Sequence, residues 1–154
     1  MSILQHDIPG ARVADLCAGS GALGLEALSR GAAFCDFVDL ADVSIRAIRE
    51  NATTLGALDR FVVHRADAVR FVQRAPAGEW DIAFADPPYH LGIAARLATA
   101  WLERPYARVL SVEHDVHEVL PPGGERRVYG STGVTIYRGE RAERSPDTGQ
   151  GAGG

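Results

Sequence analysis

The sequence predicts an α/β fold whose central sheet is mostly parallel, and two patterns lead to this prediction. Short apolar runs alternate along the chain with segments of helical periodicity, as expected for β-α-β units that connect neighbouring parallel strands. Some runs are apolar at consecutive positions, as in Ile82-Ala83-Phe84-Ala85, which is typical of strands buried on both faces. We therefore expect a sheet that is covered by helices on both sides.

Each element is predicted from its own pattern. A strand is expected at each apolar run, and a helix at each segment whose apolar residues recur at helical spacing. In chain order these are strand 11–16, helix 22–30, strand 35–40, helix 43–55, strand 60–64, helix 68–74, strand 80–85, helix 93–103 and strand 108–113. The residues expected to face inward from the first two helices are Leu23, Ala27, Leu28, Val43, Ala47, Ile48 and Leu55.

The C-terminal part of the chain has a different pattern. After a Pro/Gly loop at residues 121–124, two short runs at 126–129 and 134–137 flank the turn residues 130–133, which predicts a hairpin. This antiparallel element would close the sheet. Residues 139–154 are dominated by Gly, Ser, Pro, Asp and Gln, so we expect a disordered tail after a single domain at residues 1–138.

Composition excludes several classes of protein. The 154 residues are 46% apolar and 23% charged, which suits one globular domain with its own core. No apolar run is long enough for a transmembrane helix, and Met1 to Pro9 do not resemble a secretory signal, so we expect a cytoplasmic protein with no membrane partner. Cys17 and Cys35 fit no metal-binding spacing; we expect buried free thiols and no metal.

The charge balance bears on nucleic-acid binding. All 16 basic residues are arginine, and the net charge is −4. Phosphate contacts dominate the affinity of nucleic-acid-binding proteins, so this net charge disfavours tight RNA binding by the chain alone. A local basic surface remains compatible with it. The polar helix faces lead us to expect a monomer.

A glycine-rich segment, Gly19-Ser20-Gly21 with Gly24, lies between the first predicted strand and helix. Glycines let the backbone turn tightly and approach a ligand, and the helix that follows offers free N–H groups. The same GxGxxG pattern fits a dinucleotide site. Asp15 at the strand end favours S-adenosylmethionine, because a carboxylate there can hold the ammonium group of the methionine moiety, whereas a pyrophosphate would gain nothing from it.

Two further acids follow the next two predicted strands. Asp39 can accept hydrogen bonds from both ribose hydroxyls, although NAD sites use the same device. Asp67 can accept from an adenine amino group or act as the N-cap of the helix that begins at Ala68, and the two roles are compatible. The residues predicted to bind the cofactor are Asp15, Ala18, Gly19, Ser20, Gly21, Asp39, Leu40, Asp67 and Ala68.

The segment Asp86-Pro87-Pro88-Tyr89, here called the DPPY loop, follows the fourth predicted strand. The two prolines stiffen the backbone and remove two donors, which leaves the carbonyl oxygens of Asp86 and Pro87 free to accept hydrogens from an incoming amine. The Asp86 carboxylate is another acceptor, and the Tyr89 ring offers a flat face for stacking a base. We predict that these four residues are catalytic and position an exocyclic amino nitrogen of a nucleic-acid base for methylation.

These residues resemble the RsmD family of small-subunit ribosomal RNA guanine-N2 methyltransferases. The resemblance is strongest over residues 15–32 (DLCAGSGALGLEALSRGA), and it includes Asn51, Gly56, the DPPY loop and residues 127–132 (RVYGST). It implies a Rossmann-like, seven-stranded class I methyltransferase fold with S-adenosylmethionine as cofactor. It further implies that the substrate is a guanine N2 amine of 16S ribosomal RNA, met as RNA or in an assembling small ribosomal subunit.

Three features depart from the family pattern. Cys17 stands where an aromatic residue is usual, and Ala41 stands where an acid is usual, with Asp42 displaced by one position. Family members also have an N-terminal segment with a basic hairpin that helps to bind RNA and covers the cofactor. Met1-Ser2-Ile3-Leu4 resembles the end of that segment, so we expect that this chain lacks it, which affects autonomous RNA methylation more than cofactor binding.

Three alternative functions are weighed against this prediction. A DNA adenine-N6 or cytosine-N4 methyltransferase would use the same DPPY loop, but such enzymes usually have a sequence-reading domain. A non-catalytic S-adenosylmethionine-binding remnant is suggested by the missing N-terminal segment and opposed by intact Asp86 and Tyr89. A nicotinamide dehydrogenase would leave the DPPY loop unexplained.

Overall fold

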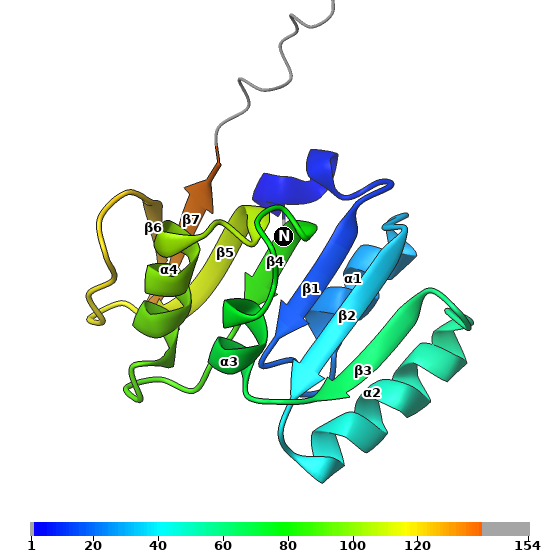
Figure 1. Cartoon of the computed structure of the whole chain (residues 1–154). Helices are drawn as coiled ribbons and strands as arrows, with labels where there is room; N and C mark the ends of the chain where they lie inside the picture. Colours follow the sequence, from blue (N-terminus) through cyan, green and yellow to red (C-terminus); the bar gives the residue numbers. More distant parts are fainter. Residues whose placement is uncertain (1, 140–154) are drawn as a thin grey trace, which may run out of the picture.

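The computed structural model describes residues 2–139, whose helices and strands are coloured along the chain in Figure 1. The order of elements is β-α alternation followed by a hairpin. The elements are η1 (Ser2–Asp7), β1 (Arg12–Leu16), α1 (Ala22–Ser29), β2 (Phe34–Asp39), α2 (Asp42–Leu55), β3 (Phe61–Arg65), α3 (Ala68–Gln73), β4 (Trp80–Ala85), α4 (Ile93–Glu103), β5 (Ala107–Asp115), β6 (Glu125–Tyr129) and β7 (Thr132–Arg138).

The strands form one seven-stranded sheet in the order β3-β2-β1-β4-β5-β7-β6. The five strands from β3 to β5 are parallel, and β7 pairs antiparallel with both β5 and β6. The chain runs outward from β1 to β3 and then returns to β4 on the other side of β1. The strand order therefore reverses between β1 and β4, which is where open α/β sheets bind ligands. The predicted fold class, including the antiparallel end, is confirmed.

Helices cover both faces of the sheet (Figure 1). On one face, α1, α2 and η1 pack on side chains such as Val13, Phe37 and Ile82. On the other face, α3 and α4 pack on the alternate side chains of the same strands, such as Val38 and Leu110. Burial of both faces explains why the central strands are apolar at consecutive positions.

The structure corrects the predicted inner face of α2. Ile48 is fully buried, whereas Val43 and Leu55 are 70% and 42% exposed. The helix packs near the edge of the sheet, mostly on β3, and only its middle part reaches the core. The spacing of apolar residues predicted the position of the helix correctly. It overestimated how much of the helix is buried against the sheet.

Smaller differences from the predicted elements concern the C-terminal part of the chain. The predicted four-residue turn of the hairpin has only two residues, Gly130 and Ser131, because Tyr129 pairs with Thr132. Gly130 has a φ of 64°, as two-residue hairpin turns require of a glycine. β5 extends two residues beyond its predicted end. From residue 140 onward, the predicted disordered tail lies outside the described residues. No helix of the described part is long and apolar enough to cross a membrane.

Candidate functional site

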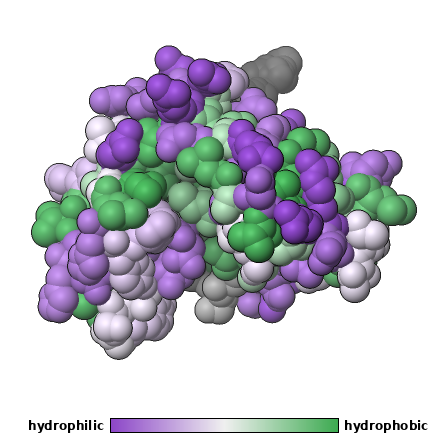
Figure 2. Space-filling model, turned by 90° about the horizontal axis from the view of Figure 1, so that it is seen from below, coloured by the Kyte–Doolittle hydropathy of each residue, from purple (hydrophilic) through white to green (hydrophobic). Residues whose placement is uncertain are grey.

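The glycine loop (residues 17–21) and the DPPY loop open side by side. β1 and β4 are parallel neighbours, and Leu16 at the end of β1 pairs with Ala85 at the end of β4. The two loops therefore leave the same edge of the sheet on adjacent strands, at the lower edge in Figure 1. Figure 2 looks onto this edge and shows a hollowed centre where hydrophobic residues lie among hydrophilic ones. The two loops are therefore neighbours in space although about 65 residues separate them in the chain.

Asp15 lies beneath the glycine loop and is only 2% exposed. Its Oδ2 accepts a hydrogen bond of 2.8 Å from the backbone N–H of Gly24 in α1. The pKa of this carboxyl is raised to about 7, chiefly by burial, with smaller contributions from the charges of Asp86 and Asp39 and an opposing effect of the Gly24 hydrogen bond. A cation bound beside Asp15 would favour its ionised form, as expected for a residue that holds an ammonium group.

Two glycines shape the loop for different reasons. Gly19 has a φ of 60°, and a side chain there would meet open space, so its backbone conformation is what favours glycine. Gly24 has no such requirement, but a Cβ at this position would lie 2.4 Å from Cε1 of Phe37. Gly24 thus lets α1 pack against β2, while Gly19 provides the left-handed backbone conformation that the loop needs.

Asp39 holds the glycine loop to the end of β2. One carboxylate oxygen accepts from the N–H of Gly19 at 2.8 Å, and the other accepts from the N–H of Ala41 at 2.9 Å. Asn51 of α2 donates to the carbonyl oxygen of Ser20 at 3.2 Å. The predicted ribose-binding acid is therefore also a structural support of the loop, a role that the sequence did not reveal. Each carboxylate oxygen keeps lone pairs for further donors.

A cavity of about 210 Å³ opens at this edge. Its lining brings together four predicted cofactor-binding residues, Asp39, Leu40, Asp67 and Ala68, with Pro88 of the DPPY loop. Asp15, Ala18, Gly19, Ser20 and Gly21 do not line it; they lie at the glycine loop beside it. Oδ2 of Asp67 accepts from the N–H of Arg70 at 3.0 Å, so the predicted N-cap of α3 is confirmed and coexists with a place on the cavity wall.

Cys17 also lines this cavity, in contrast to the fully buried Cys35. The expectation of two buried thiols is therefore correct for Cys35 and only half correct for Cys17. Burial, followed by the charges of the neighbouring aspartates, raises the pKa of the Cys17 thiol to about 12. The Cys17 side chain is thus a protonated thiol on the cavity wall at neutral pH.

The DPPY loop is fixed at both ends. Pro87 is buried, and the Tyr89 hydroxyl lies 3.3 Å from Oγ1 of Thr132 at the start of β7. The next residue, His90, has a φ of 66°, and its N–H donates to Oε2 of Glu118 at 3.3 Å. The Asp86 side chain remains partly exposed, and partial burial raises its pKa above the ordinary value.

Glu113 lies beside the start of the DPPY loop, a position that the sequence did not indicate. It follows Val112, which pairs with Ala85, so Glu113 lies level with Asp86 on the neighbouring strand. The side chain is half-buried, and its pKa is raised by burial and then by the charge of Asp86. The available signal was a single acid at the end of an apolar strand. Within the described residues, these acids form no group suited to a metal ion.

Comparisons with known proteins agree with this geometry. A family model described as conserved hypothetical protein 95 matches residues 1–138. Putative rRNA methyltransferase YlbH of Bacillus subtilis is 36% identical over 140 residues, which are 84% of this chain and 76% of that protein. Ribosomal RNA small subunit methyltransferase D of Escherichia coli is 37% identical over 144 residues, which are 86% of this chain and 71% of that protein. The chain belongs to this methyltransferase D family.

The likeness extends to the three-dimensional structure. A solved structure described as putative methyltransferase yhhF from Escherichia coli matches with a TM-score of 0.78 at 28% sequence identity. The match covers 90% of this chain and 81% of that one. The overall fold described above is therefore shared with that solved structure.

Two departures from the family pattern have local explanations in this member of the methyltransferase D family. Cys17 has a φ of 59° and packs against the core beneath α3 and α4, so the thiol occupies a packing position. The acid displaced from position 41, Asp42, forms an ion pair with Arg65 at the surface and does not line the cavity. The Ala41 N–H, in turn, supports Asp39.

Proposed function

We propose that this chain transfers a methyl group from S-adenosylmethionine to the exocyclic N2 amine of a guanine in 16S ribosomal RNA. The main support is the register of β1 and β4, which sets the DPPY loop directly beside the glycine loop. An amine held by one loop would therefore lie close to a ligand held by the other. The chain's membership of the methyltransferase D family supports the same reaction.

The cavity and its acids fit the proposed cofactor. When bound, S-adenosylmethionine would supply an activated methyl group on a sulfonium. Asp15 would hold its ammonium group, and the free lone pairs of Asp39 would accept from the ribose hydroxyls. Asp67 and Leu40 line the cavity where the adenine would lie. The carboxylates at this site would attract a ligand with two positive centres, the ammonium and the sulfonium. They would repel the phosphates of a dinucleotide.

The chain's own contribution to the reaction is to hold and orient the amine. The lone pair of an exocyclic amine is delocalised into the base, so the free nitrogen is a weak nucleophile. Acceptors aimed at its two hydrogens, the Asp86 carboxylate and the carbonyl oxygen of Pro87, would favour a pyramidal nitrogen with an available lone pair. The bound sulfonium would supply the methyl group, with the C–S bond breaking as the N–C bond forms, and Asp86 or water would take the surplus proton from the amine. Positioning supplies most of the rate enhancement.

Glu113 supports guanine over the other amino-bearing bases. The Watson–Crick edge of guanine presents the N1–H donor beside the N2 amine. In adenine and cytosine the ring nitrogen beside the amine is an acceptor. A second carboxylate next to Asp86 would accept from guanine N1–H and would repel the lone pair of the other two bases.

Methyl transfer from tritiated S-adenosylmethionine tests this function. The substrates are 30S particles that lack the modification, deproteinised 16S ribosomal RNA and double-stranded DNA, followed by nucleoside analysis. We expect label in N2-methylguanosine from a ribosomal substrate. Label in N6-methyladenine or N4-methylcytosine of DNA would replace this proposal with a DNA methyltransferase. Binding of S-adenosylhomocysteine without any transfer would identify a non-catalytic remnant, and binding of NAD alone would exclude all of these.

A further inference from the structure

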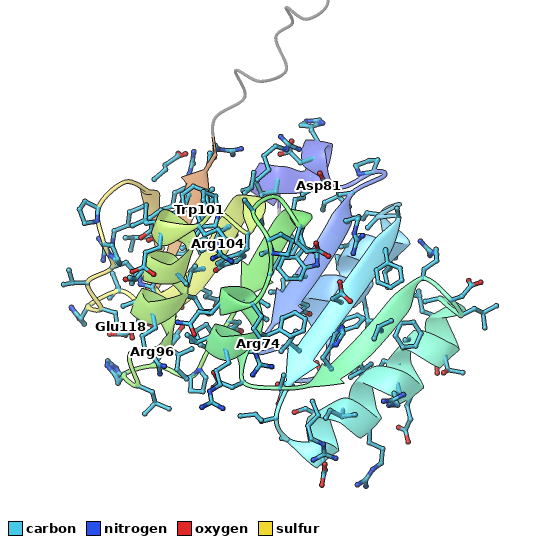
Figure 3. The ribbon with its side chains drawn as sticks, in the orientation of Figure 1. Arg74, Asp81, Arg96, Trp101, Arg104 and Glu118 are labelled. Carbon is cyan, nitrogen blue, oxygen red and sulfur yellow. The ribbon has the colours of Figure 1, made fainter. Side chains whose placement is uncertain are left out.

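The helix layer formed by α3 and α4 has an uneven charge distribution. The two helices and their C-cap residues include four exposed arginines and a single exposed acid, Glu103. The arginines are Arg70, Arg74, Arg96 and Arg104, here called the α3–α4 arginine surface. Figure 3 shows the last three of these on the side of the sheet that faces the viewer. On the opposite face, α1 and α2 with their C-caps have as many acids as arginines. The α3–α4 layer is thus basic within a chain of net charge −4.

Within residues 2–139, the arginines of this surface form no ion pair. Among residues 2–139, Arg70, Arg74 and Arg96 form no salt bridge, whereas Arg12, Arg30, Arg65 and Arg127 each pair with an acid. Arg104 donates to the carbonyl oxygen of Ala75 at 3.2 Å, which joins the ends of the two helices. A guanidinium without a partner keeps all its donors for an external anion, and its planar fork matches phosphate oxygens.

The arginine surface begins at the mouth of the cavity. Ala68 and Ile93, the first residues of α3 and α4, line the cavity. Arg70 and Arg96 lie in the first turn of each helix, two and three positions after these lining residues. From Arg96 the surface extends along α4 to Arg104, about 12 Å further at 1.5 Å per residue. Charges spread along a line suit several successive phosphates better than one anion.

We propose that the α3–α4 arginine surface binds the RNA backbone next to the target nucleotide, while the flipped base enters beside the DPPY loop. This inference rests on the proposed function and adds to it the direction from which the RNA approaches. The acids around the cavity would repel a backbone laid across the site itself, so the phosphates need a separate basic surface. The α3–α4 arginine surface provides it at the edge of the cavity.

The test compares two double variants with equal loss of charge. Arg70→Ala with Arg96→Ala removes the two arginines at the mouth. Arg46→Ala with Arg49→Ala is the matched control, since both are exposed on α2 and neither forms a salt bridge within the described part of the chain. Binding of deproteinised 16S ribosomal RNA is measured over a series of KCl concentrations. Methyl transfer to 30S particles and calorimetry with S-adenosylhomocysteine accompany it.

For the first variant we expect weaker RNA binding and a slope of log K against log salt that is shallower by about 1.4, or 0.7 per lost phosphate contact on single-stranded RNA. The KM for 30S particles rises, and S-adenosylhomocysteine binding is unchanged. The corresponding Arg→Lys double variant keeps the charge and the slope, which shows that the fold tolerates changes there. The α2 control keeps wild-type values throughout.

Two results would overturn the inference while leaving the proposed function intact. One is a wild-type salt slope in Arg70→Ala/Arg96→Ala alongside normal RNA methylation. The other is an equal loss in the α2 control, which would mean that net charge and not this surface determines binding. If the wild-type chain neither binds nor methylates any RNA, the proposed function fails, and this inference fails with it.

Discussion

The Oδ2 atom of Asp39 accepts a hydrogen bond of 2.8 Å from the backbone N–H of Gly19. This bond joins the acid predicted to bind the ribose to the loop predicted to bind the methionine moiety. The protein's own hydrogen bonding therefore holds the two parts of the site in a fixed relation to each other. Such preorganisation reduces the ordering cost of binding.

Replacement of Asp39 by Ala should weaken S-adenosylhomocysteine binding by about 1–3 kcal/mol, since hydrogen bonds to a charged group are lost and the Gly19 and Ala41 N–H groups lose their acceptor. Calorimetry measures the dissociation constant. Asp42→Ala is the control, because Asp42 lies nearby, does not line the cavity and pairs only with Arg65 at the surface. An unchanged dissociation constant in Asp39→Ala would contradict the ribose assignment.

Replacement of Asp86 by Ala separates chemistry from cofactor binding. The carboxylate is proposed to orient the amine, so we expect turnover to fall by at least about a hundredfold, as when one preorganised group is removed from an active site. The affinity for S-adenosylhomocysteine should change by less than about tenfold. Single-turnover methyl transfer to 30S particles and calorimetry measure the two quantities. Normal turnover in this variant would refute the role given to the DPPY loop.

Replacement of Asp15 by Asn should raise the free energy of unfolding and lower the affinity for the cofactor. Its folded-state pKa of about 7 lies above the ordinary value of 3.8, so the folded chain retains this proton as the pH rises from about 4 to 7. Over that window the unfolded chain releases its proton first, and the free energy of unfolding falls as the pH rises. Asp15→Asn should remove this loss, which amounts to at most about 4 kcal/mol.

Urea unfolding at pH 5 and pH 8 tests this prediction for Asp15→Asn and for the exposed control Asp59→Asn. Asp15→Asn should gain more stability relative to the wild type at pH 8 than at pH 5, while binding S-adenosylhomocysteine more weakly because the ammonium loses its counter-charge. Equal stability of the Asp15 variant and wild type at both pH values would show that the carboxyl is not destabilised by burial.

Glu113→Ala should remove the preference for guanine. The lost hydrogen bond from N1–H to a charged acceptor is worth about 1.5–3 kcal/mol. The value of kcat/KM for 30S particles should therefore fall by about 10- to 150-fold. The base preference is read from competitive inhibition by guanosine monophosphate and by the monophosphate of 2-aminopurine riboside, which keeps the amine but lacks N1–H. The wild type should prefer the guanine nucleotide, and Glu113→Ala should not. Glu103→Ala on the surface of α4 is the control, and a retained preference in Glu113→Ala would remove Glu113 from base recognition.

Much of this site could be predicted from local sequence. The alternation of apolar runs with helical segments determined the α/β class, and the prolines, glycines and strand-end acids determined the two loops and their chemistry. These are short-range properties: the side-chain period reports local burial, and Pro and Gly report local backbone preferences. The two-residue hairpin turn was missed because only strand pairing reveals that Thr132 faces Tyr129.

The sequence by itself thus determined which residues have the chemistry for cofactor and amine binding. Only the tertiary structure decided that β4 lies beside β1 and that Glu113 lies level with Asp86. It also decided that Asp39 supports Gly19, and that the arginines of α3 and α4 share one face of the sheet near the cavity. Strand order and helix packing depend on contacts between residues far apart in the chain. A local sequence pattern does not determine which of several similar apolar surfaces pack against each other.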